Sequence, residues 1–125
     1  MKTVKTSQAP SAIGPYSQGK IAGNLLFASG QIPLDPATGE VAGSNITEQT
    51  EQVMKNIEAL LASQNLTFDN VIKSTCYLAD MNDFAAFNAV YEKSFAASYP
   101  ARTAISVLGL PKDVLVEVEI IAELE

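Results

Sequence analysis

Residues 100–125 read PARTAISVLGLPKDVLVEVEIIAELE, and they carry most of the information in the chain. A turn at 108–113 that contains Gly and Pro separates two segments rich in β-branched residues, a composition typical of strands. We therefore expect strands at 100–107 and 114–125. In the second strand every other residue from Val114 to Leu124 is apolar. Because side chains alternate across a strand, one face of this strand should lie on the core.

Arg102 and Glu117 are the charged residues of these strands that suit chemistry on a small anion. Arg102 shares a strand face with Ala104 and Ser106, and Glu117 lies opposite the apolar face of its own strand. If the apolar faces of both strands lie on the same core, Arg102 and Glu117 project together from the other side of the sheet. A guanidinium can bind a carboxylate through two hydrogen bonds, and a carboxylate can transfer a proton. We therefore expect the two side chains to form one site.

The composition indicates one globular domain over residues 1–125. The chain has 125 residues, of which 47% are hydrophobic and 18% charged, and a net charge of −6. Its Lys and Arg residues are scattered, which argues against nucleic acid or an anionic membrane as partner. No segment has the pattern of a signal peptide or the length of a membrane-spanning helix. A single cysteine cannot form an internal disulfide, so we expect a cytoplasmic protein.

Several kinds of site are excluded by the residues that the chain lacks. It has no histidine and one cysteine, which removes His-based triads, His- or Cys-ligated metal sites and CxxC redox chemistry. It has neither a GxGxxG motif nor a phosphate-binding P-loop. We therefore expect no metal and no cofactor, and chemistry that uses arginine, carboxylates, hydroxyls, backbone groups and water.

The remaining elements follow from hydrophobic periodicity and turn signals. The sequence predicts, in order, a strand at 3–5, strands at 18–22 and 25–30, a helix at 45–63, a strand at 70–78 and a helix from 81 or 82 to 97. Gly23-Asn24 suits a hairpin turn, and Asn45 with Glu48 resembles a capping box. Alternation in the 70–78 strand places Ile72, Ser74, Cys76 and Leu78 on one face.

The second helix carries an aromatic stripe of Phe84, Phe87, Tyr91 and Phe95, which we interpret as core. Asn88 lies apart from that stripe. It could be a hydrogen-bonding residue of a cleft or interface, or a solvent-exposed residue. Two helices cannot cover both faces of one sheet, so we expect an α+β domain with both helices on one face of a mixed sheet. Leu108, Leu110, Leu115 and Ile121 then remain on the open side. Exposed apolar surface of this kind usually marks an interface, and we expect an oligomer whose sheets face each other.

Four separated motifs in this order resemble the RidA family, also called YjgF and, in older naming, endoribonuclease L-PSP. They are AIGPYSQG at 12–19, FASGQIPLDP at 27–36, YE at 91–92 followed by PART at 100–103, and LPKDV at 110–114 followed by EVEIIA at 117–122. The resemblance implies a chorismate-mutase-like α+β fold and a homotrimer with three clefts between subunits. It also implies a cofactor-free deaminase of 2-aminoacrylate and 2-aminocrotonate, which pyridoxal-phosphate-dependent dehydratases release. The products are 2-keto acids and ammonia.

The same resemblance implies roles for individual residues. Arg102 would hold the substrate carboxylate together with the backbone N–H of Ala104, and Glu117 would position or activate water. Tyr16, Ser29 and Gly30 would line the cleft. Many family members have cysteine where this chain has Ala104, so a redox role of that thiol is not available here.

Each of these residues also has a simpler structural interpretation. Arg102 could form a salt bridge at an interface or pair with Glu117 across subunits, and Glu117 could be a solvated surface residue. Tyr16 could be a packed loop aromatic, and Cys76 is best interpreted as a buried small hydrophobe. A non-catalytic protein that binds a small carboxylate and regulates a partner uses the same arginine. The ribonuclease or translation-inhibitor activity of the older naming suits an acidic chain without histidine poorly.

Overall fold

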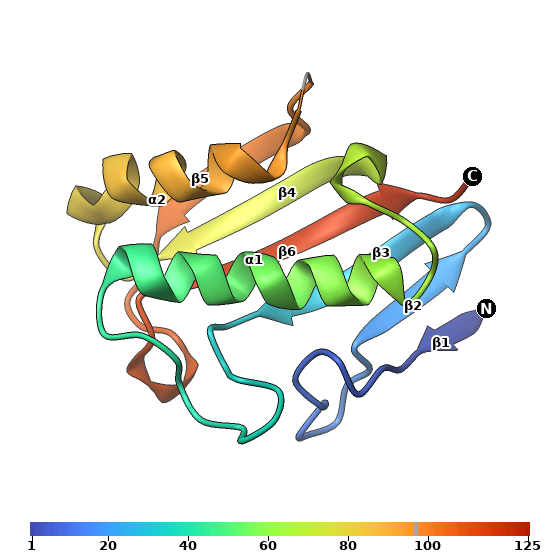
Figure 1. The fold of residues 1–125 in the computed structure, drawn as a ribbon, viewed down its shortest axis with the longest axis horizontal. Coiled ribbons are helices and arrows are strands. Elements are labelled where there is room, and N and C mark those ends of the chain that lie inside the picture. The colour runs from blue at the N-terminus through green and yellow to red at the C-terminus, as the bar shows by residue number, and fades with distance from the viewer. Residues whose placement is uncertain (97) are drawn as a thin grey trace.

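The protein is a six-stranded mixed sheet with helices packed along one side (Figure 1). The computed structural model describes residues 1–96 and 98–125. The strands are β1 (Lys2–Val4), β2 (Gly19–Ala22), β3 (Leu25–Gln31), β4 (Val71–Leu78), β5 (Ala101–Ser106) and β6 (Val116–Glu123). The described α-helices are α1 (Ile46–Ala62) and α2 (Phe84–Tyr91), and short 3-10 turns are η1 (Phe68–Asn70), η2 (Met81–Asp83), η3 (Glu92–Ser94) and η4 (Pro111–Asp113). This arrangement confirms the predicted α+β class and element order.

The sheet order places β6 in the middle and β5 at one edge. Neighbours follow the order β1-β2-β3-β6-β4-β5, and β4 and β5 form a parallel pair while the other neighbours are antiparallel. One strand, β4, therefore separates β5 from β6. None of the helices within residues 1–96 and 98–125 is long and apolar enough to cross a membrane.

Helix α1 begins where its capping residue predicts. The side chain of Asn45 accepts a hydrogen bond of 2.9 Å from the backbone N–H of Glu48. The Glu48 carboxylate in turn accepts from the backbone N–H of Ser44 at 3.0 Å, one residue before the position that a capping box uses. These bonds satisfy donors that the first turn of a helix leaves free, and so fix the start of α1.

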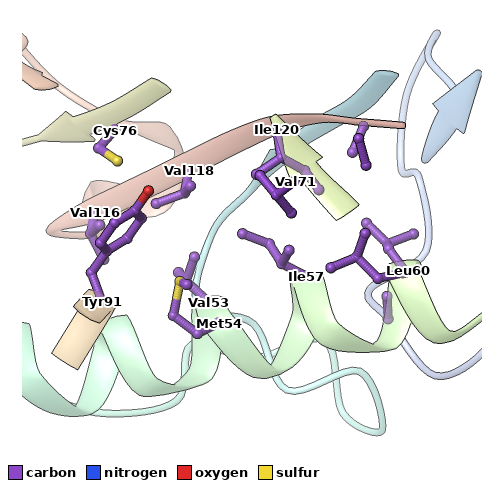
Figure 2. Close-up of a cluster of buried hydrophobic side chains, with 14 of the residues drawn as sticks. Val53, Met54, Ile57, Leu60, Val71, Cys76, Tyr91, Val116, Val118 and Ile120 are labelled. Carbon is purple, nitrogen blue, oxygen red and sulfur yellow. The ribbon is translucent and has the colours of Figure 1, made fainter. Parts of the chain in front are cut away.

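The core lies between α1 and the central strands (Figure 2). From α1, Val53, Ile57 and Leu60 point toward Val116, Val118 and Ile120 of β6. Residues between them on β6, such as Glu117, are half-buried, so the predicted alternation of this strand is confirmed. Burial of these side chains is the main favourable contribution to folding, at roughly 25 cal/mol for each Å² of apolar surface removed from water.

The other face of the sheet carries neither α1 nor α2 (Figure 1). Phe27 is 43% exposed on this face, in register with the half-buried Ile121 of β6, and Ile105 of β5 is 42% exposed. Leu108 in the following turn is fully exposed. Leu115, which is also predicted on the open side, is only partly buried and packs against the edge of the core cluster.

The first residues of β4 do not follow the predicted alternation of buried and exposed side chains. Val71 is 7% exposed and Ile72 is 44% exposed, the reverse of the prediction. The pairing of β4 with β6 shifts in register between Val71 and Lys73, which is the mark of a β-bulge. A bulge adds one residue to a strand and so exchanges the two faces on one side of it. Beyond the bulge, Ser74 and Cys76 are buried as predicted.

The second helix is shorter than predicted. Helix α2 ends at Tyr91, η3 follows, and Phe95 has extended backbone, while the predicted end at residue 97 lies outside the described residues. Phe95 packs at 4.9 Å from the ring of Tyr91 and at 5.4 Å, edge-on, from Phe68. The last aromatic of the stripe is thus core as predicted, but it reaches the core from an extended segment.

Candidate functional site

Arg102 lies on the side of the sheet that carries the helices. The parallel register of β5 and β4 places Arg102 beside Ser74 and Ala104 beside Cys76. Residues in register on neighbouring strands share a face, and Ser74 and Cys76 are buried on the core side. Because β5 is the edge strand, Arg102 is exposed there rather than buried.

Glu117 lies on the opposite, open face. Its neighbours Val116 and Val118 are buried on the core side, and Glu117 is in register with the half-buried Tyr77 of β4. The prediction that Arg102 and Glu117 project from the same side of one sheet is therefore wrong. The prediction assumes that the apolar faces of β5 and β6 lie on the same core. They do not, because Thr103 and Ile105 of β5 face away from the helices.

The Arg102 guanidinium is held by side chains of α2. Its Nη1 donates a hydrogen bond of 2.7 Å to the amide oxygen of Asn88. Its Cζ lies 5.0 Å from the ring centroid of Tyr91 and 5.4 Å from that of Phe84, distances at which a cation is attracted to a ring face. Among residues 1–96 and 98–125, the hydrogen-bond partner of the guanidinium is thus an amide and not an acid, which leaves its positive charge available to a ligand.

A surface cavity of about 390 Å³ opens beside this guanidinium. We call it the arginine pocket; it is lined by Asn88, Tyr91, Glu92, Tyr99, Pro100 and Arg102. The structure brings Asn88 and Arg102 together in this pocket, as two of the predicted site residues. Ala104 is half-buried two residues further along β5, on the same strand face as Arg102.

A second cavity, of about 510 Å³, holds the remaining predicted residues. We call it the glutamate pocket; Tyr16, Ser29, Gly30, Lys112 and Glu117 are among its lining residues. Tyr16, which is 54% exposed, comes from the loop before β2, whereas Ser29 and Gly30 belong to β3. The predicted site residues are therefore divided between two pockets on opposite faces of the sheet.

Gly30 allows the Glu117 carboxylate to lie directly against the backbone of β3. A methyl carbon placed on Gly30 would lie 2.0 Å from Oε2 of Glu117, far inside van der Waals contact. The register of β3 with β6 shifts between Ala28 and Gln31, so Gly30 belongs to a bulge, a device that redirects side chains beside sites. This contact explains why glycine is needed here.

Ser29 and Gln18 hold the loop that carries Tyr16. The Ser29 hydroxyl donates to the carbonyl of Ser17 at 2.5 Å, so it ties the loop to β3. Gln18 is 4% exposed; it accepts from the Thr6 N–H at 2.7 Å and donates to the carbonyl of Pro10 at 2.8 Å. Gln18 was not predicted as a site residue, because its position at the start of a strand does not indicate that its side chain bonds the loop.

The environment of Glu117 suits proton transfer. Burial raises the pKa of its carboxyl group, and the nearby charge of Glu119 raises it further. The Tyr77 hydroxyl donates a hydrogen bond to Glu119, and this bond, more than burial, raises the pKa of Tyr77 to about 12. A carboxyl group with a raised pKa exchanges a proton closer to neutral pH than an ordinary one, as general acid–base catalysis requires.

Cys76 and Tyr91 are protonated groups behind the arginine pocket. Burial raises the pKa of the Cys76 thiol to about 11, which fits its predicted role as a small buried hydrophobe. Burial likewise raises the pKa of Tyr91, whose hydroxyl is hydrogen-bonded to that of Ser74. Sequence reasoning assigned Tyr91 and Phe84 only to the core and missed their contact with Arg102.

Comparisons with known proteins cover almost the whole chain. A family model described as endoribonuclease L-PSP matches residues 6–124. The chain is 57% identical to a Lactococcus lactis protein named as the candidate regulator AldR, over 100% of this chain and 99% of the relative. It is 44% identical to the 2-iminobutanoate/2-iminopropanoate deaminase of Escherichia coli K12, over 97% of this chain and 96% of the relative. The crystal structure of E. coli TdcF with bound serine matches with a TM-score of 0.95 and 41% identity, covering 100% of both chains.

Proposed function

The chain belongs to the endoribonuclease L-PSP family, also called RidA or YjgF, and we therefore propose that it is a cofactor-free deaminase of 2-imino acids. The proposed reaction converts a reactive 2-imino acid and water into a 2-keto acid and ammonia. The observation that carries the proposal is the environment of the Arg102 guanidinium. Arg102 is the chain's one arginine, it is exposed beside a cavity, and an amide rather than a carboxylate is its hydrogen-bond partner.

We propose that two copies of the chain share each site. Arg102 and Glu117 lie on opposite faces of one sheet with β4 between their strands, so they cannot meet on one small acid within a single chain. If the open face of one copy packs against a neighbour, the arginine pocket of one copy can meet the glutamate pocket of the next. The exposed apolar side chains of Phe27 and Ile105 on that face support such an assembly, which the family resemblance suggests is a homotrimer.

Substrate binding then follows from the chemistry of the arginine pocket. The planar guanidinium of Arg102 binds the substrate carboxylate through parallel N–H bonds, and the backbone N–H of Ala104 adds a third donor. Fixing the carboxylate orients the C=N group of the imine. Such orientation can lower a barrier by several kcal/mol. The serine bound in TdcF supports a small amino or keto acid as the ligand.

Glu117 of the neighbouring copy performs the proton transfers. It takes a proton from water as the water oxygen attacks C2 of the protonated imine, which forms a tetrahedral amino alcohol. It then returns this proton to the nitrogen, and the C–N bond breaks. The hydroxyl proton passes to the departing ammonia, which leaves as ammonium as the keto group forms. A 2-aminoacrylate or 2-aminocrotonate substrate enters this sequence after protonation at C3. The raised pKa of Glu117 suits both steps.

A coupled assay tests this function. A pyridoxal-phosphate-dependent threonine dehydratase supplies 2-aminocrotonate, and the release of 2-ketobutyrate is followed with and without the protein. The wild-type protein is expected to accelerate this release, and Arg102→Ala is expected to abolish the acceleration while the assembly remains intact. An equal rate with and without the wild-type protein would remove the proposal.

A second candidate function is regulation by a bound carboxylate without turnover. The name of the Lactococcus relative favours it, since that protein is 57% identical to this chain. The two functions are separated by Glu117, because a carboxylate beside a bound anion is unfavourable unless it has a chemical task. Ligand binding that is unchanged by Glu117→Gln, in a protein that never accelerates keto acid release, would favour regulation.

A further inference from the structure

We infer that Phe84 and Tyr91 form an aromatic platform that fixes the Arg102 guanidinium, and that Ser74 locks this platform from beneath. Phe84, Tyr91 and Ser74 are thus positioning residues for the substrate carboxylate. This inference rests on the proposed role of Arg102 as the carboxylate anchor.

One face of helix α2 supplies the hydrogen-bond acceptor and both aromatic rings that contact the Arg102 guanidinium. Phe84, Asn88 and Tyr91 follow one another at intervals of four and three residues, which places them on the same side of a helix. Asn88 accepts a hydrogen bond from Nη1, and the rings on either side of it in sequence lie 5.4 Å and 5.0 Å from Cζ. The helix therefore presents a surface made for one guanidinium: two ring faces and a single acceptor.

Ser74 prevents the Tyr91 ring from leaving this position. The two hydroxyls are 2.6 Å apart, Ser74 is 0% exposed and Tyr91 is 4% exposed. Ser74 also stands in register with Arg102 on the adjacent strand, so β5, β4 and α2 are connected through these three side chains. Rotation of the ring would break a buried hydrogen bond and leave two buried hydroxyls unpaired, which is costly.

The platform fixes the arginine without occupying the atoms that bind substrate. A ring face attracts the guanidinium through its charge and uses none of its N–H donors, and Asn88 uses one of five. An acidic partner in the same place would compete with the substrate for the charge. A long side chain that is ordered before binding loses less conformational entropy when the ligand arrives. The platform therefore favours both affinity and a single orientation of the carboxylate.

The position of the guanidinium can be measured without any substrate. Because the chain has one arginine, the 15N-labelled protein gives a single arginine Nε–Hε resonance in an NMR spectrum. A guanidinium stacked on two rings should show this proton shifted by ring currents and protected from exchange. Tyr91→Leu is expected to move the resonance toward its value in a flexible peptide, and Phe84→Leu to move it less. Phe84 is half-buried, so its substitution remains informative if Tyr91→Leu fails to fold.

A matched control removes an aromatic ring from the same cluster at a distance from Arg102. Phe68 packs edge-on against Phe95, and the Phe68→Leu variant should leave the arginine resonance unchanged. A wild-type resonance at the flexible-peptide position, or one that neither platform variant moves, would overturn the inference. A resonance that moves as expected in a protein that never accelerates keto acid release would support the platform and reject the proposed deaminase.

Kinetics give the second measurement. The substrate carboxylate is bound in the ground and transition states alike, so loss of the platform should raise KM, and the looser orientation of the C=N group should also lower kcat. We expect about a tenfold rise in KM for Tyr91→Leu, from the usual strength of cation–ring contacts. Tyr91→Phe and Ser74→Ala should each raise KM about threefold, and the double variant no more than either, because both remove one hydrogen bond. Additive effects in the double variant, or an unchanged KM in Tyr91→Leu, would contradict a locked platform.

Discussion

The Glu117 carboxylate lies so close to Gly30 that a single added methyl carbon would lie 2.0 Å from its Oε2. The bulge of β3 therefore leaves room for this carboxylate directly against its backbone, and that backbone is part of the glutamate pocket. Any side chain on residue 30 must displace Glu117.

Gly30→Ala should consequently abolish most activity while leaving the fold in place. We expect a loss of at least about tenfold in kcat, since the displaced Glu117 side chain can no longer reach the water it activates. The loss of stability should be small, because the closest atom is the end of a flexible side chain. The measurement is the coupled keto acid assay with thermal unfolding. Gly109→Ala is the matched control, because a carbon added there meets no atom within 4 Å. Activity of Gly30→Ala within twofold of wild type would mean that Glu117 does not act from this position.

Glu119 should raise the pH at which the enzyme becomes active. Burial is the larger cause of the raised pKa of Glu117, and the charge of Glu119 raises that pKa further. A general base acts only when deprotonated, so activity should rise with pH through the Glu117 pKa. Glu119→Gln keeps an acceptor for the Tyr77 hydroxyl but removes the charge. The acidic limb of the kcat/KM profile should then move to lower pH, whereas Glu123→Gln, at the exposed end of β6, should leave it in place. If the acidic limb of the Glu119→Gln profile stays in place, the Glu119 charge does not act on the pKa of Glu117.

The same raised pKa makes Glu117 a cost to stability at neutral pH. Its carboxyl group binds protons more tightly in the folded protein than in the unfolded chain, so stability falls as pH rises from the ordinary value of 4.5 through the raised one. Glu117→Gln should raise Tm at pH 7, and this gain should shrink as pH falls toward 4. Activity should fall by about 10²-fold or more, the usual contribution of a general base. A lower Tm at pH 7 with activity retained would show that Glu117 is structural.

Gln18 should be the most sensitive polar residue of the Tyr16 loop. Gln18→Ala leaves the Thr6 N–H and the carbonyls of Thr6 and Pro10 without this partner, and we expect a loss of about 2–3 kcal/mol in stability. Gln8→Ala is the control, because Gln8 is exposed and its amide donates to the hydroxyl of the neighbouring Ser7 at 3.3 Å. Denaturant unfolding and proteolysis of the 7–16 loop check both. Equal stability of the two variants would contradict the anchoring role of Gln18.

The sequence predicts the centre of this fold well because the central strand has a strict pattern. Val116, Val118 and Ile120 alternate with polar or half-buried residues, and the structure buries them as expected. Asn45 caps α1 through a local hydrogen bond that four consecutive residues specify. Patterns of this kind need no knowledge of distant partners.

The predictions from sequence are wrong where the face or contact of a residue depends on a strand or helix distant in the sequence. The face of β5 depends on its register with β4, and both of its faces carry small or moderately apolar side chains, so periodicity alone leaves the position of Arg102 open. The bulge at Val71 is likewise visible only in the pairing with β6. The link from Tyr91 to Arg102 joins a helix to an edge strand, and no local signal marks it. The grouping of Tyr16, Ser29, Gly30 and Glu117 could be expected only from the family resemblance.

Arg102 and Glu117 should act on one substrate from two different copies of the chain. To test this, the inactive variants Arg102→Ala and Glu117→Gln are unfolded together and refolded as a mixture, and keto acid release is followed. If each site takes one residue from each of two neighbours, random mixing in equal amounts should restore about a quarter of wild-type activity. A mixture as inactive as its two components, in assemblies shown to contain both variants, would exclude a site shared between two copies.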